Sequence, residues 1–511
     1  MSDASAAGDR TAGDSTTRDS TARGADSGAD GRGPARRIVL ATSNGTGMGH
    51  LARQAAVALA LQDTVDAEPL VFSLSQAVHV VTRHGLRAEY CPSHHRNWMP
   101  HLSWHGYLAA RVGALLAETG ADTFVFDGVA PYLGLLRARA AHPDVAFVWV
   151  RRGMWRPGAN RRALAAEPFF DLVVEPGDLA AEADRGATAG RRNAVQVPPI
   201  SVWPRSRPLS RPEAAAALGL DPDRPTALVT LGAGSINDAV TPALAAIRTF
   251  LDRPEWQVAV TRAPLARSGL PPAEAARVHE LVDVYPLARH LAAFDAAVSA
   301  AGYNAVHELL PAGVPTVLVP NAATATDDQR TRSEAVAQAG LAVLAVDDTA
   351  PSVAAACARV LDPAVRAELA AACARLPTPT GDLATAEQLR NLAGFTGHRA
   401  GRAERLRAFD LEARAGVMRA LGPAGTSAVR RALGRLPVPG PMRPLAVRPT
   451  VTDRLDPAQL RGDHPVEHVL AGSSPAYRAR RLAIAHDAYR WPAEAEPDDR
   501  LARTGRPAGR A

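Results

Sequence analysis

Residues 299–320 read SAAGYNAVHELLPAGVPTVLVP, and this short stretch joins a strand, a helix and a second strand. The first apolar run ends in Ala-Ala-Gly, and the helical pattern starts immediately after it. The backbone amides of Gly302, Tyr303 and Asn304 would then point beyond the strand end, where the positive end of a helix dipole attracts anions such as pyrophosphate. Glu308 follows in the same helix, where its carboxylate could accept hydrogen bonds from two hydroxyls of a ribose.

The same alternation of strands and helices extends over most of the chain. Strand-like apolar runs include RIVLAT (37–42) and TFVFDG (123–128) before this stretch, and TALVTLG (226–232) and WQVAVTR (256–262) closer to it. The other expected strands are PLVFSLS, AFVWVRR, DLVVEP, ELVDVYP, AAVSAAG, TVLVPN and LAVLAVD. Strands that alternate with helices predict parallel sheets, so we expect an α/β fold of two tandem doubly wound, Rossmann-like domains that face a cleft. In such sheets the ligand binds beyond the carboxyl ends of the strands.

Composition divides the chain into four predicted segments. Residues 1–36 contain Ser, Thr, Ala, Gly, Asp and Arg without periodicity, which predicts a disordered tail. The two α/β domains would cover 37–202 and 203–396, and the proline-rich VPPISVWPRSRP (197–208) would link them. Residues 397–511 form a basic extension that is partly helical and partly rich in proline.

The positive charge of the chain is concentrated in this extension. Residues 397–511 contain 21 Arg against 12 Asp and Glu, a net charge of +9, whereas the rest of the chain has 37 basic and 40 acidic residues, a net charge of −3. A nucleic-acid-binding role for the core is therefore not favoured. The helical pattern at 403–421 predicts a basic amphipathic helix, which would either lie on an anionic membrane or partner, or pack on its own domain.

Residue usage excludes several classes of chemistry. All 58 basic residues are arginine, so the lysine-dependent phosphate loop, the kinase lysine and Schiff-base chemistry are excluded. Cys91, Cys357 and Cys373 form no CxxC pair and are expected to be buried thiols rather than a disulfide or a zinc site. We find no apolar run of about 18 residues and no apolar signal core. A cytoplasmic protein of a GC-rich bacterium is expected, free or peripheral at the inner face of the membrane.

A second glycine-rich segment, SNGTGMGH (43–50), lies between the first expected strand and a helical pattern. Glycines at this place let the backbone bend sharply and approach a ligand. A dinucleotide-binding domain would show GxGxxG and an acidic residue at the end of the second strand, but this loop has the spacing GxGxG and the second strand ends in SLSQ. A purely structural glycine turn is the other alternative, and the final His50 is the feature that it explains least well.

These motifs resemble those of the GT-B-fold glycosyltransferases, in particular the branch that contains the lipid II N-acetylglucosaminyltransferase and monogalactosyldiacylglycerol synthase. The resemblance covers roughly 37–396. It rests on the spacing from serine to glutamate in 299–308, on the Gly-x-Pro turn, and on the loop that ends in Gly-His. It implies that a sugar is transferred from a nucleoside-diphosphate sugar, in particular a UDP-sugar, to a hydroxyl of a lipid, polysaccharide or natural product. Inversion at the sugar and no metal cofactor are further expectations.

The resemblance also assigns roles to residues. His50 would be the base that removes the acceptor proton. Asp127 is placed by its own position rather than by the resemblance: it ends the strand-like TFVFDG and should point into the cleft, where it would orient His50 or be the less favoured base. The loop LGAGS (231–235) would approach the phosphates, and Asp328 would bind the donor sugar with the glutamine that follows it. The complete predicted donor site is Gly47, Gly49, Gly232, Gly234, Ser235, Arg262, Val284, Tyr285, Gly302, Tyr303, Asn304, Glu308, Asp328 and Gln329.

The sequence departs from the family pattern at two positions and leaves alternatives open. Ala300 stands where the family often has Arg, Cys or His, and Arg332 stands where Asn is expected. A nucleotide-sugar epimerase or hydrolase of the same fold is one alternative, although NAATATDDQ replaces the Thr-Glu-Arg-Pro-Glu-like segment of the epimerases. A non-catalytic nucleotide-sugar-binding scaffold is the other. Locally, Glu308 could be a surface residue, His50 a core histidine, and Asp328 a helix N-cap.

A cluster of histidines lies in the segment HHRNWMPHLSWHGY. His101 and His105 have helical spacing, and His94 and His95 precede them, but no HExxH motif accompanies the four. We therefore expect a loop that lines the acceptor side of the cleft rather than a metal site.

Overall fold

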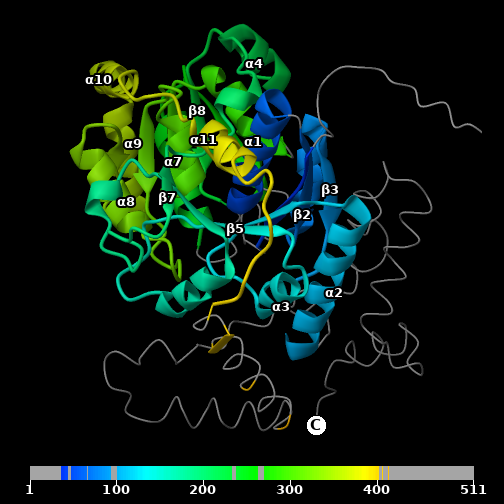
Figure 1. The fold of residues 1–511 in the computed structure, drawn as a ribbon. Coiled ribbons are helices and arrows are strands. Elements are labelled where there is room, and N and C mark those ends of the chain that lie inside the picture. The colour runs from blue at the N-terminus through cyan, green and yellow to red at the C-terminus, as the bar shows by residue number, and fades with distance from the viewer. Residues whose placement is uncertain are drawn as a thin grey trace, which may run out of the picture. The chain divides into compact units, whose positions relative to one another are not determined.

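The computed structural model describes residues 36–43, 48–65, 67–93, 101–232, 238–262, 270–282 and 284–401, and the single positions 405, 406, 413 and 420 (Figure 1). The predictions for Gly47, Gly234 and Ser235 lie outside the described residues. So do His94 and His95, the tail before Arg36 and almost all of the basic extension. The proposed contact between the extension and an anionic surface therefore stays a prediction.

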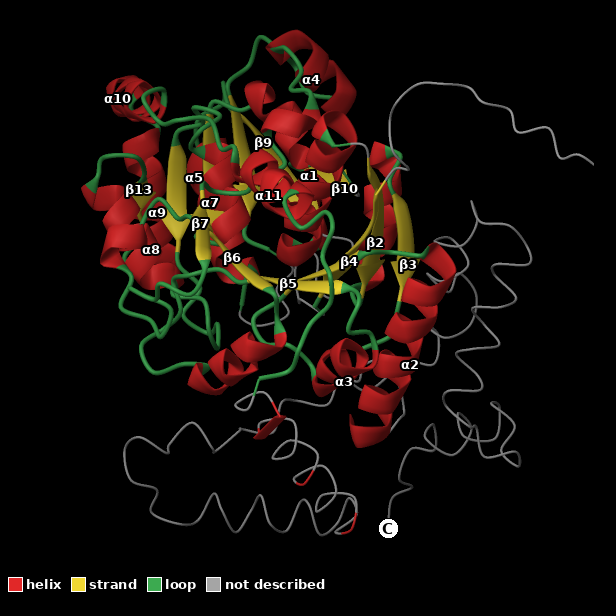
Figure 2. Ribbon diagram, viewed as in Figure 1, coloured by secondary structure: helices red, strands yellow, loops and turns green. Residues whose placement is uncertain are grey.

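The first sheet is parallel, and its seven described strands have the order β3-β2-β1-β4-β5-β6-β7 (Figure 2). The strands are β1 (Arg36–Thr42), β2 (Ala67–Ser73), β3 (Arg87–Tyr90), β4 (Thr123–Asp127), β5 (Ala146–Val150), β6 (Leu172–Pro176) and β7 (Val195–Val197). The helices are α1 (Gly49–Thr64), α2 (His101–Thr119) and α3 (Leu133–Ala141), with 3-10 helices η1 (Gln76–His84), η2 (Arg161–Phe169) and η3 (Ala181–Ala183). The short strands β3 and β7 were not predicted from the sequence.

The second sheet is also parallel, and its six described strands have the order β10-β9-β8-β11-β12-β13. The strands are β8 (Thr226–Thr230), β9 (Gln257–Arg262), β10 (His279–Val282), β11 (Ala296–Ala300), β12 (Thr316–Val319) and β13 (Val343–Leu344). Its helices are α4 (Arg211–Leu218), α5 (Val240–Leu251), α6 (Pro272–Ala275), α7 (Tyr303–Leu309), α8 (Gln329–Gln338), α9 (Ala350–Val360) and α10 (Pro363–Cys373), with η4 (Pro204–Ser206) and η5 (Leu287–Ala293). The predicted pair of doubly wound α/β sheets is confirmed.

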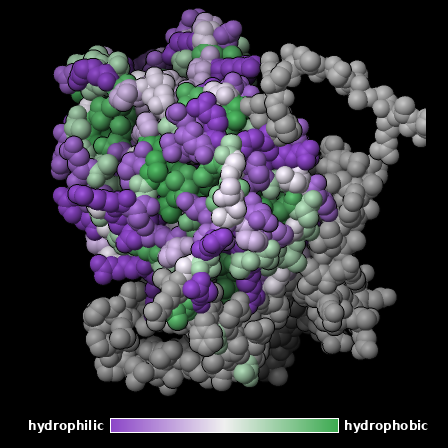
Figure 3. Space-filling view, in the orientation of Figure 1, coloured by the Kyte–Doolittle hydropathy of each residue, from purple (hydrophilic) through white to green (hydrophobic). Residues whose placement is uncertain are grey.

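Both faces of each sheet are buried, which explains the continuous apolar runs in the sequence. In β1, Ile38 and Leu40 belong to one hydrophobic cluster, whereas Val39 and Ala41 belong to another on the opposite face. The three cysteines are buried and unpaired, as predicted. Figure 3 shows hydrophilic side chains over most of the described surface on this face, with smaller hydrophobic areas between them. Within the described part of the chain, no helix has the length and apolar character required to cross a membrane.

The two sheets are joined by buried contacts and by a returning helix. The cluster that contains Ile38 also contains Leu228 and Leu281 from the second sheet. The predicted linker is itself partly packed, because Ile200 is fully buried. A last helix, α11 (Gly381–Arg390), packs against α1 of the first domain, and its Gly381 amide donates a hydrogen bond to the Pro199 carbonyl (3.0 Å).

The strand orders place the predicted site residues at two reversal points. In the first sheet the order changes direction between β1 and β4, and His50 and Asp127 follow these two strands. In the second sheet it changes between β8 and β11, which precede Gly232 and Gly302. Ligands of doubly wound sheets bind in the crevice at such points.

Candidate active site

A pocket of about 450 Å³ lies beyond the strand ends of both sheets. The first domain contributes residues that follow β1 and β5, and the second contributes residues that follow β8, β11 and β12. The lining includes the following predicted residues: Gly49, His50, Gly232, Val284, Tyr285, Gly302, Tyr303, Asn304, Glu308 and Gln329. Residues more than 250 positions apart in the chain are therefore brought to one site.

Two predicted donor residues do not line the pocket among the described residues. Arg262 is exposed at the end of β9. Asp328 is the N-cap of α8, where its carboxylate accepts hydrogen bonds from the Thr331 amide (3.2 Å) and hydroxyl (2.9 Å). The neighbouring acid, Asp327, lines the pocket instead. The turn before α8 thus directs the second acid of the pair to the helix end and the first acid to the pocket.

His50 and Asp127 form a hydrogen-bonded pair at the base of the first-domain wall. His50 Nδ1 lies 2.7 Å from Asp127 Oδ1, and Asp127 is only 1% exposed. Arg53, one turn after His50 in α1, donates from Nε to Oδ2 (2.9 Å) and from Nη2 to Oδ1 (2.7 Å) of the same carboxylate. Burial alone would raise the pKa of Asp127, but the Arg53 charge, His50 and their hydrogen bonds hold it below its ordinary value.

The Asp127 carboxylate favours one tautomer of His50. An ionised carboxylate oxygen at 2.7 Å requires a proton on Nδ1, since otherwise two lone pairs would face each other. Arg53 Nη2 also lies 2.8 Å from Nδ1 and by itself would favour the opposite tautomer. The same Nη2 has Asp127 Oδ1 as an acceptor at 2.7 Å, whereas a proton on Nδ1 gives both His50 and Arg53 a hydrogen bond to the carboxylate. Nε2 therefore keeps its lone pair. Burial lowers the pKa of His50, and the Arg53 and Arg152 charges lower it further against the opposing effect of Asp127, so the imidazole is neutral near pH 7 and can accept a proton.

Two residues of the second domain that line the pocket, Glu308 and Tyr285, have polar atoms without a hydrogen-bond partner among the described residues. Glu308 is partly buried in α7, and its carboxylate forms no hydrogen bond or ion pair with the described residues. Burial raises the pKa of Glu308 to about 8. The Tyr285 hydroxyl is buried and also lacks a hydrogen-bond partner in the described part of the chain. Buried polar groups are nearly always hydrogen-bonded, so the Glu308 carboxylate is available to a bound ligand. The Tyr285 hydroxyl has almost no exposed surface, so a ligand could reach it only if neighbouring side chains moved.

The structure requires glycine at one of the three described glycine positions that line the pocket but not at the other two. Gly232 has a φ of +87°, a conformation that favours glycine. A Cβ atom on Gly49 would meet Arg53 and Asn304 at 3.8 and 3.9 Å, and a Cβ on Gly302 would meet a single atom at 4.0 Å. These are ordinary contact distances, so the protein itself does not demand glycine at the last two positions. Their open space lets a ligand approach the backbone.

Asn304 ties the start of α7 to the start of α1. Its Nδ2 donates to the Gly49 carbonyl (3.2 Å), and its Oδ1 accepts from Arg53 Nη1 (3.3 Å). The N-caps Met48 of α1 and Gly302 of α7 provide no side-chain hydrogen bond, and neither described first turn contains an acidic residue. The helix starts of both domains therefore present uncapped backbone amides toward the pocket.

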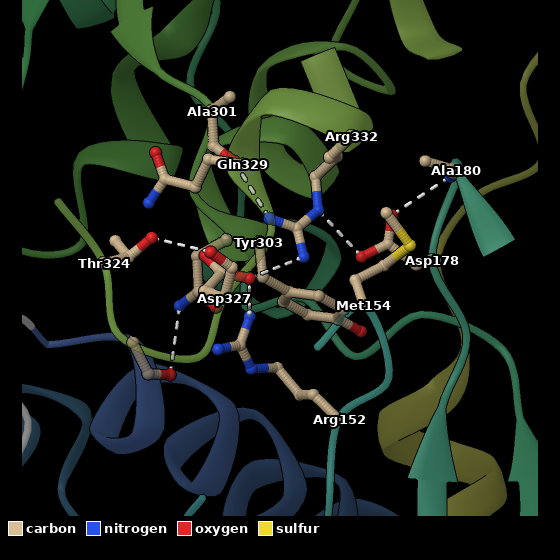
Figure 4. Close-up of polar contacts among 12 residues, drawn as sticks. Arg152, Met154, Asp178, Ala180, Ala301, Tyr303, Thr324, Asp327, Gln329 and Arg332 are labelled. Carbon is tan, nitrogen blue, oxygen red and sulfur yellow. Dashed lines mark hydrogen bonds and ion pairs between the residues drawn. The ribbon is translucent and has the colours of Figure 1, made fainter. Parts of the chain in front are cut away.

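A buried ionic network that the sequence analysis missed closes one side of the pocket (Figure 4). Arg332 donates to Asp178 Oδ2 (2.9 Å), to Asp327 Oδ1 (2.8 Å) and to the Ala301 carbonyl (3.0 Å). Arg152 Nη1 donates to the same Asp327 oxygen (3.3 Å). Arg152 follows β5, so the rule that ligands bind at strand ends could have identified it in AFVWVRR.

The fourth histidine of the cluster, His105, is buried in α2. His101 begins the same helix. The prediction of a loop is therefore wrong for residues 101–107, which lie in α2. His105 is not among the described residues that line the pocket.

The comparison with protein families matches part of the second domain. Residues 274–375, which include Glu308, match the model of the glycosyltransferase family 28 C-terminal domain. This segment is similar to family 28. The chain is also 30% identical over 175 residues to the UDP-N-acetylglucosamine--N-acetylmuramyl-(pentapeptide) pyrophosphoryl-undecaprenol N-acetylglucosamine transferase of Phocaeicola vulgatus. That alignment covers 33% of this chain and 44% of the relative.

A transferase of the same name from Nocardioides sp. is 35% identical over 151 residues, which cover 28% of this chain and 39% of the relative. The chain thus aligns with less than half the length of these family 28-like relatives. The resemblance predicted from the sequence is confirmed.

Solved structures with a similar arrangement include spinosyn rhamnosyltransferase SpnG complexed with thymidine diphosphate, at 17% identity and a TM-score of 0.46. MurG of Acinetobacter baumannii matches at 14% identity and a TM-score of 0.44. Each match covers 70% of this chain and 99% of the other chain.

Proposed function

We propose that this protein is a glycosyltransferase that moves a sugar from a nucleoside-diphosphate sugar to a hydroxyl acceptor. One observation supports this most strongly: a neutral, oriented histidine from the first domain and an unpartnered glutamate from the family 28-like domain line the same pocket. The donor proposed is a UDP-sugar, in keeping with the names of the two curated relatives. The acceptor class remains a lipid, polysaccharide or natural product with a free hydroxyl.

In the proposed reaction His50 removes the acceptor proton. The acceptor oxygen attacks the anomeric carbon while Nε2 of His50 takes the hydroxyl proton, and the bond from that carbon to the diphosphate oxygen breaks. A single displacement of this kind inverts the anomeric centre. Asp127 stabilises the imidazolium that forms, but it is a poor base itself because Arg53 and His50 occupy its oxygens. The amides at the start of α7 would receive the developing negative charge of the diphosphate.

The reaction is proposed to need no divalent metal. The three aspartates in and behind the pocket walls are all paired with guanidinium groups: Asp127 with Arg53, Asp178 with Arg332, and Asp327 with Arg332 and Arg152. A carboxylate held in this way is a poor ligand for Mg²⁺, which prefers near-octahedral oxygen ligands that are free to coordinate it.

A donor and acceptor screen in excess EDTA tests the proposal. Nucleotide sugars are incubated with hydroxyl acceptors of each class. We expect one nucleotide sugar to release its nucleoside diphosphate only when the matching acceptor is present. This release should persist in excess EDTA. Free sugar or an epimerised nucleotide sugar without acceptor would instead identify a hydrolase or an epimerase. Binding without turnover on any acceptor would indicate a scaffold. Activity that Mg²⁺ or Mn²⁺ alone restores would contradict the metal-free reaction.

Glu308 should hold the ribose of the donor. Replacing Glu308 with alanine removes a charged acceptor of two hydrogen bonds, so affinity for UDP should fall by about ten- to a hundredfold. Isothermal titration calorimetry measures this loss. Glu334 is a suitable control, because this half-exposed glutamate of α8 pairs with Arg330 at the surface and lies outside the described pocket lining. Glu334→Ala should leave UDP affinity unchanged.

The same residue should give UDP binding a pH dependence. Because the pKa of Glu308 is raised to about 8, the carboxyl of the empty site is mainly protonated at pH 7. The ribose hydroxyls of UDP would donate hydrogen bonds to Glu308 and so favour its ionised carboxylate. UDP binding should therefore release a proton, and UDP affinity should increase as the pH rises from 7 to about 8. Titrations in buffers of different ionisation enthalpy measure the proton release. Glu308→Gln should abolish it, and an unchanged release in that variant would contradict the assignment.

A further inference from the structure

Arg152 brings a positive charge to the donor side of the pocket from the opposite domain. It comes two residues after β5, and its side chain is 16% exposed at the pocket. The guanidinium carbon lies 5.3 Å from the ring centre of Tyr303, the first residue of α7. Figure 4 shows Arg152 next to Tyr303 and Asp327, on the side of Asp327 away from Arg332. Arg152 therefore lies beside the amides that would face the diphosphate.

The second domain supplies no cation of its own among the described residues of the pocket lining. It contributes the acids Asp327 and Glu308, and its other lining residues are apolar or uncharged. At the end of β11, Ala300 lines the pocket with only a methyl group. The guanidinium groups of the lining are those of Arg53 and Arg152, both from the first domain. Positive charge to stabilise a leaving diphosphate would therefore come from Arg53 or Arg152.

These two arginines differ in the number of their N–H groups that already donate a hydrogen bond within the protein. Arg53 is 2% exposed and is bound in two places to Asp127 and in a third to Asn304. Arg152 makes a single hydrogen bond with the described residues, at 3.3 Å to Asp327. A guanidinium has five N–H donors in a planar fork, and one edge can hold a carboxylate while another binds a phosphate. Asp327 is also closer to Arg332 (2.8 Å), which leaves the charge of Arg152 less fully compensated.

The backbone around Arg152 is fixed against the loop that precedes α8. Trp155 and Asp327 form an isolated antiparallel bridge, with hydrogen bonds from the Arg156 amide to the Thr326 carbonyl (2.7 Å) and from the Asp328 amide to the Met154 carbonyl (2.9 Å). The backbone just after Arg152 is thus fixed before a ligand arrives, which lowers the entropic cost of ordering this segment on binding.

We propose that Arg152 binds the diphosphate of the nucleotide donor and stabilises it as the leaving group. This inference rests on the proposed function and adds to it a substrate-binding residue from the acceptor-side domain. The donor site then consists of uncapped amides and Glu308 from the second domain and one cation from the first. A diphosphate can bind fully only where both domains face the same pocket.

Arg152→Gln tests the proposal because glutamine keeps a polar N–H donor but removes the charge. We expect affinity for UDP to fall by about ten- to a hundredfold, while affinity for uridine, which has no phosphate, changes less than about twofold. The dependence of UDP affinity on salt should also weaken in the variant. Thymidine diphosphate and thymidine serve as the second probe pair in case the nucleobase is thymine. Arg152→Lys should recover part of the loss.

Arg156→Gln is the matched control. Arg156 belongs to the same segment and donates to the Ala322 and Thr324 carbonyls of the same loop (2.9 Å each), but it is outside the described pocket lining. It should leave the ratio of UDP to uridine affinity unchanged. If Arg152→Gln weakens UDP and uridine equally, or if Arg156→Gln reproduces its effect, Arg152 holds the loop and does not bind phosphate.

The outcomes also separate this inference from the proposed function. Wild-type protein that binds neither nucleoside diphosphate, and transfers no sugar, would contradict the proposed function. Wild-type protein that transfers sugar, together with an Arg152→Gln variant that keeps its UDP-to-uridine ratio and its turnover, would overturn only the role of Arg152.

Discussion

Replacement of His50 with alanine should lower the saturated turnover rate by about two to four orders of magnitude, because a base that takes the proton in the transition state contributes that much. Donor affinity should change little, since in the proposed reaction His50 would meet the acceptor and the ribose contact would come from Glu308 in the other domain. The measurements are the saturated rate, the dissociation constant of UDP and the melting temperature of the same variant. Only the first should change strongly.

His50→Gln distinguishes a base from a packing residue. Glutamine can form hydrogen bonds at this position but cannot accept a proton at neutral pH, so its rate should be as low as that of His50→Ala. If His50 only packed the loop or touched phosphate, the variants would lose stability or donor affinity and keep their saturated rate. A His50→Ala rate above about a tenth of the wild-type rate would exclude His50 as the base.

Asp127→Asn should have an effect of similar size through a different cause. The asparagine amide has a single acceptor oxygen, whereas His50 and Arg53 each donate a hydrogen bond to the Asp127 carboxylate. If the amide NH₂ group faced His50 Nδ1, it would favour the tautomer with the proton on Nε2. Turnover should fall by about two to four orders of magnitude. Because the Asp127 charge raises the pKa of His50 against the effect of burial, its loss should lower that pKa further. The acidic limb of the pH–rate profile should then move to lower pH.

Asp127→Asn should also lower the stability of the protein, because the substitution leaves the buried Arg53 without its charged partner. Removing one member of a buried ion pair costs about 3–5 kcal/mol of unfolding free energy. The double variant Asp127→Asn with Arg53→Met should recover stability, since no buried charge is left unpaired, but it should not recover turnover. Recovery of both would mean that Asp127 serves folding alone.

The chain contains a natural control for this experiment. Asp171 pairs with Arg139 (3.0 Å) and with His398 Nδ1 (2.8 Å), and so repeats the His-Asp-Arg grouping outside the described pocket lining. Asp171→Asn should lower the free energy of unfolding to a comparable degree while the folded protein keeps its turnover. Equal losses of turnover in Asp171→Asn and Asp127→Asn, measured on folded protein, would contradict a specific role for Asp127.

The sequence alone determined the features that depend on local order along the chain. Apolar runs alternating with helical patterns predicted two parallel sheets, because a strand buried on both faces needs a continuous apolar segment. His50 and Glu308 could be predicted since each lies in a helix that begins just after a strand, and the ends of parallel strands meet at one edge. The strands β3 and β7 were missed because four and three residues contain too little pattern to detect.

Only the tertiary structure decided which distant side chains meet. Asp327 and Asp328 are adjacent, and no local pattern shows that one faces the pocket while the other caps α8. The bridge between Trp155 and Asp327 fixes the turn that makes this choice. The position of Arg152 beside Tyr303 likewise depends on how the two domains pack. Hydrophobic periodicity specifies which face of an element is buried, but contacts between side chains far apart in sequence depend on the distances and directions that packing imposes.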